Sequence, residues 1–164
     1  MVTRAMTTYY WLLFIHVTGA FLLIGGTVVA GAFNLAAQTR ERPSEVALLY
    51  GLTRFAVIAI ILGALVTLVF GLWLVDEAPA GYHYSQGWII SALILWVIAM
   101  AAGGRGGRRD RETHEFAARL AAEGDQPSAE LKARMRDPLS LALSYGSGLV
   151  ILAMLAIMIW KPGA

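Results

Sequence analysis

Residues 55–75 read FAVIAIILGALVTLVFGLWLV, an apolar run without a single charged side chain. About 20 apolar residues in a helix cross a hydrocarbon core that is about 30 Å thick. Because no water in that core can satisfy the backbone N–H and C=O groups, a segment of this kind spans the membrane as a helix. We therefore predict a transmembrane helix at these residues.

Three further runs meet the same criterion, at residues 9–37, 84–102 and 139–160. The chain is 58% hydrophobic and 15% charged, whereas soluble domains carry about 25% charged residues. We predict a single-domain, all-α membrane protein built as a four-transmembrane-helix bundle. The first run is longer than the apolar part of a secretory signal, about 7–15 residues, so we expect it to be retained. The sequence has no cysteine, which excludes disulfides and thiolate metal sites.

The basic residues are distributed unevenly between the two sides of the predicted membrane. Eleven of the thirteen lie in residues 38–54 and in a basic loop at residues 103–137, and the other two are Arg4 and Lys161. Short cytoplasmic loops carry an excess of Lys and Arg. We therefore predict a multi-pass protein of the inner (plasma) membrane, with the lipid bilayer as its partner and both termini outside the cytoplasm. Four of the five tryptophans fall at the outer rim, the level that indole rings favour.

Small residues recur at four-residue spacing in three of the predicted spans. They are Ala59, Gly63, Thr67 and Gly71 in one span, Ser140, Ser144 and Gly148 in another, and Gly26 and Ala30 in the first. Small side chains allow membrane helices to approach closely. We therefore expect a compact bundle.

The basic loop begins with GGRGG at residues 103–107, a sequence that predicts a break in the third span and a flexible hinge. Residues 108–123 then predict an amphipathic helix with Phe116 and Leu120 as an apolar pair. Ser128 is the expected cap of a second short helix. The basic surface either attracts anionic lipid or only sets the topology, and no motif indicates nucleic-acid binding.

His16 is the one Asp, Glu, Lys, Arg or His residue within the four spans. It lies about six residues inside the outer aromatic rim, a depth of roughly 9–10 Å. Ionisable residues in membranes face the bundle interior or a cavity, and imidazole is a good ligand for haem iron. Gly19, on the same helix face, leaves room for a flat macrocycle or for a neighbouring helix. Met154 has a similar depth in the fourth span and is the candidate second ligand.

Three interpretations of His16 stay open. It donates an interhelical hydrogen bond to a Thr, a Ser or a backbone carbonyl; it binds haem b or another porphyrin, with Gly19 and Met154 beside it; or it binds another metal or handles protons. His83 lies on the same outer side and is the candidate partner for a metal. His114, in the charged loop, is expected to face solvent.

The motif FIHVTGA at residues 14–20, followed by two glycines, resembles the start of an uncharacterised family of small bacterial integral membrane proteins of unknown function. The resemblance covers most of the chain and includes Gly71, Trp73 and Trp88. More loosely, the first span is similar to the copper-resistance-D-type membrane domain and to the HemJ-type protoporphyrinogen oxidase, in which a first-helix histidine is associated with haem. This looser similarity implies a porphyrin for His16.

The leading functional prediction is a small membrane redox or porphyrin-binding protein with His16 as ligand. No motif identifies a catalytic residue, so the sequence does not decide whether the protein is an enzyme. One alternative is a non-catalytic accessory subunit of a larger membrane complex, or a homo-oligomer, in which the bundle only packs. Another is a small-solute carrier, which the lack of paired charges and Pro-broken helices in the spans disfavours.

Overall fold

The computed structural model describes residues 2–163, with side chains from Thr7 onward. The chain forms five helices in the order α1 (Val2–Gln38), α2 (Pro43–Glu77), α3 (Gly87–Ala122), α4 (Ala129–Met135) and α5 (Pro138–Trp160), and residues 2–163 contain no strand. The α1, α2 and α3 helices and the segment that ends with α5 are long and apolar enough to cross a membrane. The predicted all-α architecture with four transmembrane helices is therefore confirmed.

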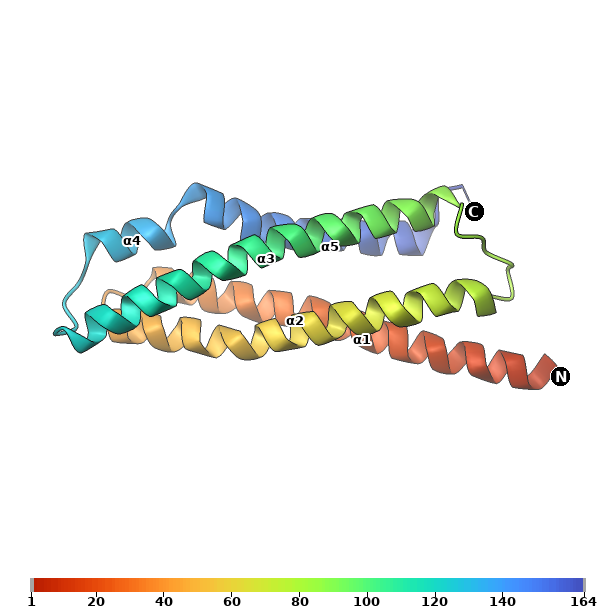
Figure 1. The fold of residues 1–164 in the computed structure, drawn as a ribbon, viewed down its shortest axis with the longest axis horizontal. Coiled ribbons are helices and arrows are strands. Elements are labelled where there is room, and N and C mark those ends of the chain that lie inside the picture. The colour runs from red at the N-terminus through yellow and green to blue at the C-terminus, as the bar shows by residue number, and fades with distance from the viewer. Residues whose placement is uncertain (1, 164) are drawn as a thin grey trace.

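The four long helices form two antiparallel pairs, in which α1 packs along α2 and α3 packs along α5 (Figure 1). The pairs are joined mainly through α2 and α3. We call one end of the bundle the terminal end, because α1 begins there, α5 ends there and the loop at residues 78–86 closes it (Figure 1). The opposite end carries α4 and most of the basic residues, and we call it the basic end.

The first three helices are longer than a membrane requires. They contain 37, 35 and 36 residues, so each is roughly 52–56 Å long, whereas the hydrocarbon core is about 30 Å thick. Past the apolar runs they form a second core at the basic end, around Val46, Tyr50 and Ala117. The segment at residues 103–137, predicted as a basic loop that contains two short helices, consists mostly of the second half of α3 together with α4.

The glycine-rich sequence at residues 103–107 does not break α3, so the predicted hinge is wrong. A glycine in a helix costs up to about 1 kcal/mol relative to alanine, and here contacts with α5 offset that cost. A Cβ atom added to Gly106 would lie 3.2 Å from the Ser144 Oγ, and one added to Gly103 would lie 3.9 Å from the Ser147 Oγ. Gly106 therefore allows α3 and α5 to approach closely, whereas a Cβ atom at Gly103 would make only an ordinary contact.

Two expectations for the basic end are confirmed. Phe116 and Leu120 pack against the basic-end core, on the apolar face of the charged half of α3. The Ser128 side chain accepts a hydrogen bond of 3.3 Å from the Leu131 N–H and caps α4. In this core, Ala117 of α3 and Leu131 of α4 pack with Val46 of α2.

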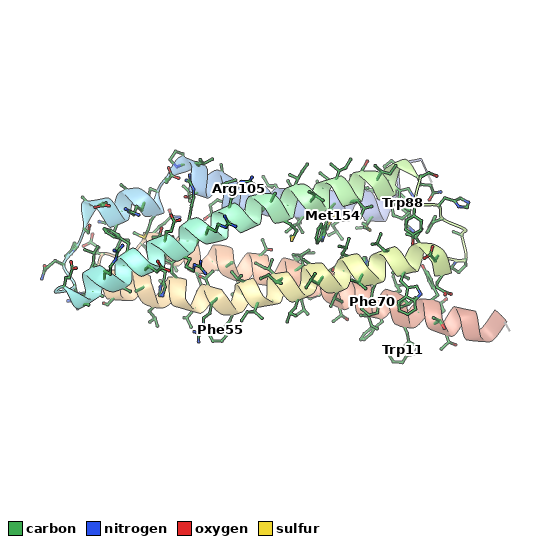
Figure 2. All side chains as sticks on the ribbon, in the orientation of Figure 1. Trp11, Phe55, Phe70, Trp88, Arg105 and Met154 are labelled. Atoms are coloured by element: carbon green, nitrogen blue, oxygen red, sulfur yellow. The ribbon has the colours of Figure 1, made fainter. Side chains whose placement is uncertain are left out.

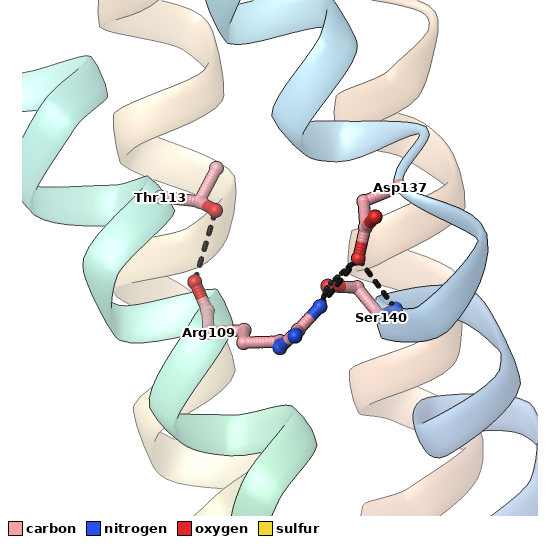
Figure 3. A network of polar contacts seen from close by, with 4 residues as sticks. All are labelled: Arg109, Thr113, Asp137 and Ser140. Carbon is pink, nitrogen blue, oxygen red and sulfur yellow. Dashed lines mark hydrogen bonds and ion pairs between the residues drawn. The ribbon is translucent and has the colours of Figure 1, made fainter.

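A polar network at the start of α5 ties that helix to α3 (Figure 3). The Asp137 carboxylate caps α5 by accepting hydrogen bonds from the Ser140 N–H at 2.9 Å and from the Ser140 hydroxyl at 3.0 Å. The Arg109 guanidinium donates to Asp137 and, at 3.2 Å, to the Ser140 hydroxyl. The network sets where α5 begins, directly beside the Gly106–Ser144 contact.

Two glycines at the α1–α2 interface have no room for a side chain. A Cβ atom added to Gly63 would lie 2.4 Å from the Leu23 nitrogen and 2.7 Å from the Gly19 carbonyl oxygen, and one added to Gly26 would lie 2.9 Å from the Ala56 carbonyl oxygen. The small residues predicted to favour close packing therefore lie against the opposite backbone. This close contact brings residues of α1 against the backbone of α2.

Candidate functional site

A cavity of about 490 Å³ lies between the two helix pairs at the terminal end. All four long helices and the loop at residues 78–86 contribute to its lining. Most of the lining is aliphatic. The side chains that bring polar atoms to it are Tyr9, His16, Thr67, Tyr82, Trp88, Trp96 and Lys161.

His16 lines this cavity from α1 and is held against α2. Its Nδ1 atom lies 2.9 Å from the Thr67 carbonyl oxygen. A carbonyl oxygen can only accept, so Nδ1 carries the proton, and in the neutral imidazole Nε2 keeps its lone pair. No residue of the described chain bonds to Nε2. The interhelical hydrogen bond expected as one role of His16 is therefore present, and it leaves the second nitrogen available.

Gly71 provides the space that the His16 ring occupies. A Cβ atom at this position would lie 2.8 Å from the His16 Cε1 atom and 3.0 Å from its Nδ1 atom. Gly71 follows Thr67 by four residues, so both lie on the same face of α2. The carbonyl of Thr67 and the missing side chain of Gly71 together form a seat for the imidazole.

His114 has a seat of the same kind further along α2. Its Nδ1 atom lies 3.0 Å from the Ala47 carbonyl oxygen, and a Cβ atom added to Gly51, four residues later, would lie 3.4 Å from the His114 Cε1 atom. The expectation that His114 faces solvent is therefore corrected, because the ring is half-buried against α2. His114 does not line the terminal-end cavity. Of the two histidines that contact α2 in this way, His16 is the one that lines the cavity.

Met154 lies on the same cavity, on the side formed by α3 and α5 (Figure 2). Its side chain is buried, with 7% exposure, and Met158 lines the cavity one turn nearer the terminal end. The structure thus places His16 and Met154 on one cavity, although they come from different helix pairs.

Gly19 and His83 do not line the cavity. A Cβ atom added to Gly19 would lie 2.7 Å from the Val66 side chain and 2.8 Å from the Thr67 nitrogen. The space at Gly19 is therefore filled by the neighbouring helix, one of the two occupants expected there. His83 is exposed in the loop at residues 78–86, and no group of three or more His, Asp or Glu residues in the described chain could hold a metal ion.

Two polar atoms of the lining lack hydrogen-bond partners in the described chain, the Trp96 Nε1 and the Thr67 Oγ1. A buried donor without an acceptor costs about 1–3 kcal/mol, so each such atom in a native fold calls for an explanation. Sequence reasoning did not assign these residues to the site. The available signal was that Trp96 is the one tryptophan placed deep within a predicted span.

Tyr82, Trp88 and Lys161 line the cavity near the terminal end of the bundle. The Lys161 ammonium donates a hydrogen bond of 2.7 Å to the Tyr82 hydroxyl. It also lies 4.6 Å from the centre of the Tyr82 ring and 5.6 Å from that of Trp88. A cation and two aromatic rings therefore lie together on a cavity whose lining is mostly aliphatic, and the sequence did not predict this grouping.

Comparison with known proteins adds one finding. A family model described as "Predicted integral membrane protein (DUF2269)" matches residues 10–162. The matched range contains every residue of the cavity lining except Tyr9. A comparison with curated proteins and one with solved structures each gave no match.

Proposed function

We propose that this chain, which belongs to the DUF2269 family of predicted integral membrane proteins, binds haem or a related porphyrin in the terminal-end cavity. The resemblance of its first span had predicted membership of this family. His16 is the residue that would hold the haem iron. The observation that carries the proposal is the Nδ1 hydrogen bond to the Thr67 carbonyl. A histidine that binds a metal through one ring nitrogen usually donates the other N–H to a carbonyl or carboxylate, which sets the tautomer and the ring orientation.

The cavity suits a group of this kind in size and in character. Its volume of about 490 Å³ lies within the range of roughly 300–1,000 Å³ that is usual for small-molecule and cofactor sites. The aliphatic lining favours a flat hydrophobic macrocycle. Met154 is the proposed second ligand, because its thioether lies on the opposite helix pair and Met with His is an established pair at haem iron. Bound haem would supply one-electron redox chemistry, and this chain would position it and exclude water.

We place the protein in the inner (plasma) membrane with both termini outside the cytoplasm. The basic end of the bundle carries eleven of the thirteen Lys and Arg residues, and cytoplasmic segments are the ones enriched in these residues. In this orientation the cavity lies in the outer half of the bundle. Its proposed ligand is then reached from the outer face or from the outer leaflet.

The proposal is tested by the absorption spectrum of the protein purified in mild detergent after haem-supplemented expression. We expect a Soret band that is lost in His16→Ala. Met154→Leu should keep the haem but change its spectrum, because only the second ligand is removed. His114→Ala is the matched control, since it removes an imidazole seated on α2 in the same way but away from the cavity.

The His16→Ala variant is compared with wild type by size-exclusion chromatography, so that a loss of haem is separated from a loss of folding. His16→Gln is measured in parallel, because an amide keeps a donor for the Thr67 carbonyl while removing the imidazole. A colourless wild-type protein that also fails to take up added haem would overturn the proposal. An unchanged Soret band in both His16 variants would remove His16 as the ligand.

A further inference from the structure

A single basic side chain, at the end of α5, lines the cavity near the terminal end of the bundle. Lys161 follows the last residue of α5 and adopts a left-handed backbone conformation, with φ 41° and ψ 60°. Only a few per cent of non-glycine residues have a positive φ. The Lys161 N–H closes the helix by donating to the Ile157 carbonyl at 2.8 Å. This cap turns the chain at the point where the Lys161 side chain reaches the cavity lining.

The Lys161 ammonium has no carboxylate partner among residues 7–163, where the ion pairs join other groups. One of its three N–H donors goes to the Tyr82 hydroxyl, and the adjacent rings of Tyr82 and Trp88 present their π-faces to the charge. Asp76, an acidic residue at the same end of the bundle, accepts a hydrogen bond of 2.8 Å from Tyr84. Among residues 7–163, this positive charge on the cavity lining therefore has no acidic partner.

The polar groups of the cavity are separated along its length. Lys161 comes seven residues after Met154 on α5, so it lies about two turns, or roughly 10 Å, nearer the terminal end. The Met154 sulfur therefore lies farther from the terminal end than the Lys161 cation, and both residues line the cavity together with His16. A ligand that matches this arrangement has an apolar body and an acidic group at one edge.

We infer that Lys161 binds a carboxylate of the cavity's ligand, so that the site selects a flat amphiphile with its acidic edge toward the terminal end of the bundle. The inference rests on the proposed porphyrin site and names the chemical class that the site accepts. A charge-assisted hydrogen bond from an ammonium to a carboxylate is about twice as strong as a neutral one. A lipid phosphate carries similar chemistry, and the experiment separates the two sources.

The test uses metal-free protoporphyrin IX and its dimethyl ester, because neither depends on iron ligation by His16. The purified full-length protein, in phosphatidylcholine nanodiscs, is titrated with each compound while porphyrin fluorescence is followed. We expect wild type to bind the diacid at least about tenfold more tightly than the diester. Lys161→Gln should abolish this preference, and Lys161→Arg should keep it. Arg108→Gln, at an exposed position of the opposite end, removes one positive charge as a control and should change nothing.

Equal affinities of wild type for the diacid and the diester would overturn the inference and leave a His16-dependent Soret band untouched. Binding of neither porphyrin, together with a colourless haem-supplemented protein, would instead remove the proposed function itself. Nanodiscs that contain phosphatidylglycerol provide the lipid arm. If Lys161→Gln weakens the binding of phosphatidylglycerol but leaves the preference for the diacid unchanged, Lys161 binds a phosphate headgroup, and the assignment of a ligand carboxylate is overturned.

Discussion

The Nδ1 atom of His16 lies 2.9 Å from the carbonyl oxygen of Thr67, across the interface between α1 and α2. This contact joins packing to chemistry, because the same hydrogen bond that connects two helices also leaves Nε2 with its lone pair. An interhelical hydrogen bond and metal ligation are often treated as alternatives for a histidine in a membrane. Here they use different nitrogens of one ring, and the second-ligand candidate Met154 lines the same cavity.

Gly71→Ala should displace the His16 ring, because the added Cβ would lie 2.8 Å from the His16 Cε1 atom. We expect haem affinity to fall by about 10–100-fold, the usual effect of losing a group that orients a metal ligand. The affinity is measured by titrating the ligand-free protein with haem. Gly25→Ala is the control, since its Cβ would have no neighbour within 4 Å. Equal haem affinities of the two variants would contradict the assigned role of Gly71.

Gly63→Ala should destabilise the bundle without touching the cavity. The added Cβ would lie 2.4 Å from the Leu23 backbone nitrogen, and a backbone cannot move aside as a flexible side chain can. We expect a loss of about 1–3 kcal/mol, typical of overpacking, measured as a lower denaturation midpoint in detergent. Gly146→Ala, with no neighbour within 4 Å, should be neutral or up to about 1 kcal/mol stabilising. A Gly63→Ala midpoint equal to that of wild type would show that α1 and α2 are less closely packed.

Acid should weaken the start of α2, where Asp125 acts as a cap from a distant loop. Its carboxylate accepts hydrogen bonds of 2.7 Å from the Ser44 hydroxyl and from the Ser44 N–H. Both hydrogen bonds lower the pKa of Asp125 below its usual value of 3.8, and the bond from the hydroxyl has the larger effect. A lowered folded-state pKa means that the stabilisation is present above pH 3.8 and is lost as the pH falls through the folded-state pKa.

Hydrogen exchange of the first turn of α2 measures this effect. Wild type should exchange faster as the pH is lowered from 5 toward about 3, after correction for intrinsic rates, because protonation weakens the cap. Asp125→Asn should exchange faster at pH 5 and lose most of the added pH dependence. Asparagine tolerates the positive φ of 56° at this position, so the variant tests the charge and not the backbone. The same acid response in both proteins would assign it to other carboxyl groups.

The absence of cysteine from the sequence allows the orientation to be measured directly. Ser85→Cys places a thiol in the exposed loop of the terminal end, and Gln126→Cys places one at the exposed tip of the basic end. In spheroplasts, a membrane-impermeant maleimide should label the first variant at once and the second only after permeabilisation. The reverse pattern would place the termini in the cytoplasm.

Apolar run length predicted the existence and number of the spans, but not the ends of the helices. The run at residues 84–102 predicted a third span, whereas α3 runs from Gly87 to Ala122. The difference arises because hydropathy detects lipid exposure, while a helix continues wherever its backbone bonds and contacts favour it. The GGRGG sequence would favour a turn in isolation, and only its contacts with Ser144 and Ser147 make it a helix interface.

The sequence by itself determined that this is a four-span α-helical membrane protein with an uneven charge distribution, and it singled out His16 as a residue that must face the interior. Those conclusions follow from the free-energy cost of placing backbone and ionisable groups in lipid. That cost depends on the composition of each segment and not on the neighbouring helices. The tertiary structure alone decided which nitrogen of His16 is available, that Gly19 serves the helix contact, and that Trp96 and Lys161 share the cavity with Met154. These relationships depend on the rotation and register of one helix against another, which small residues spread over all four helices set together.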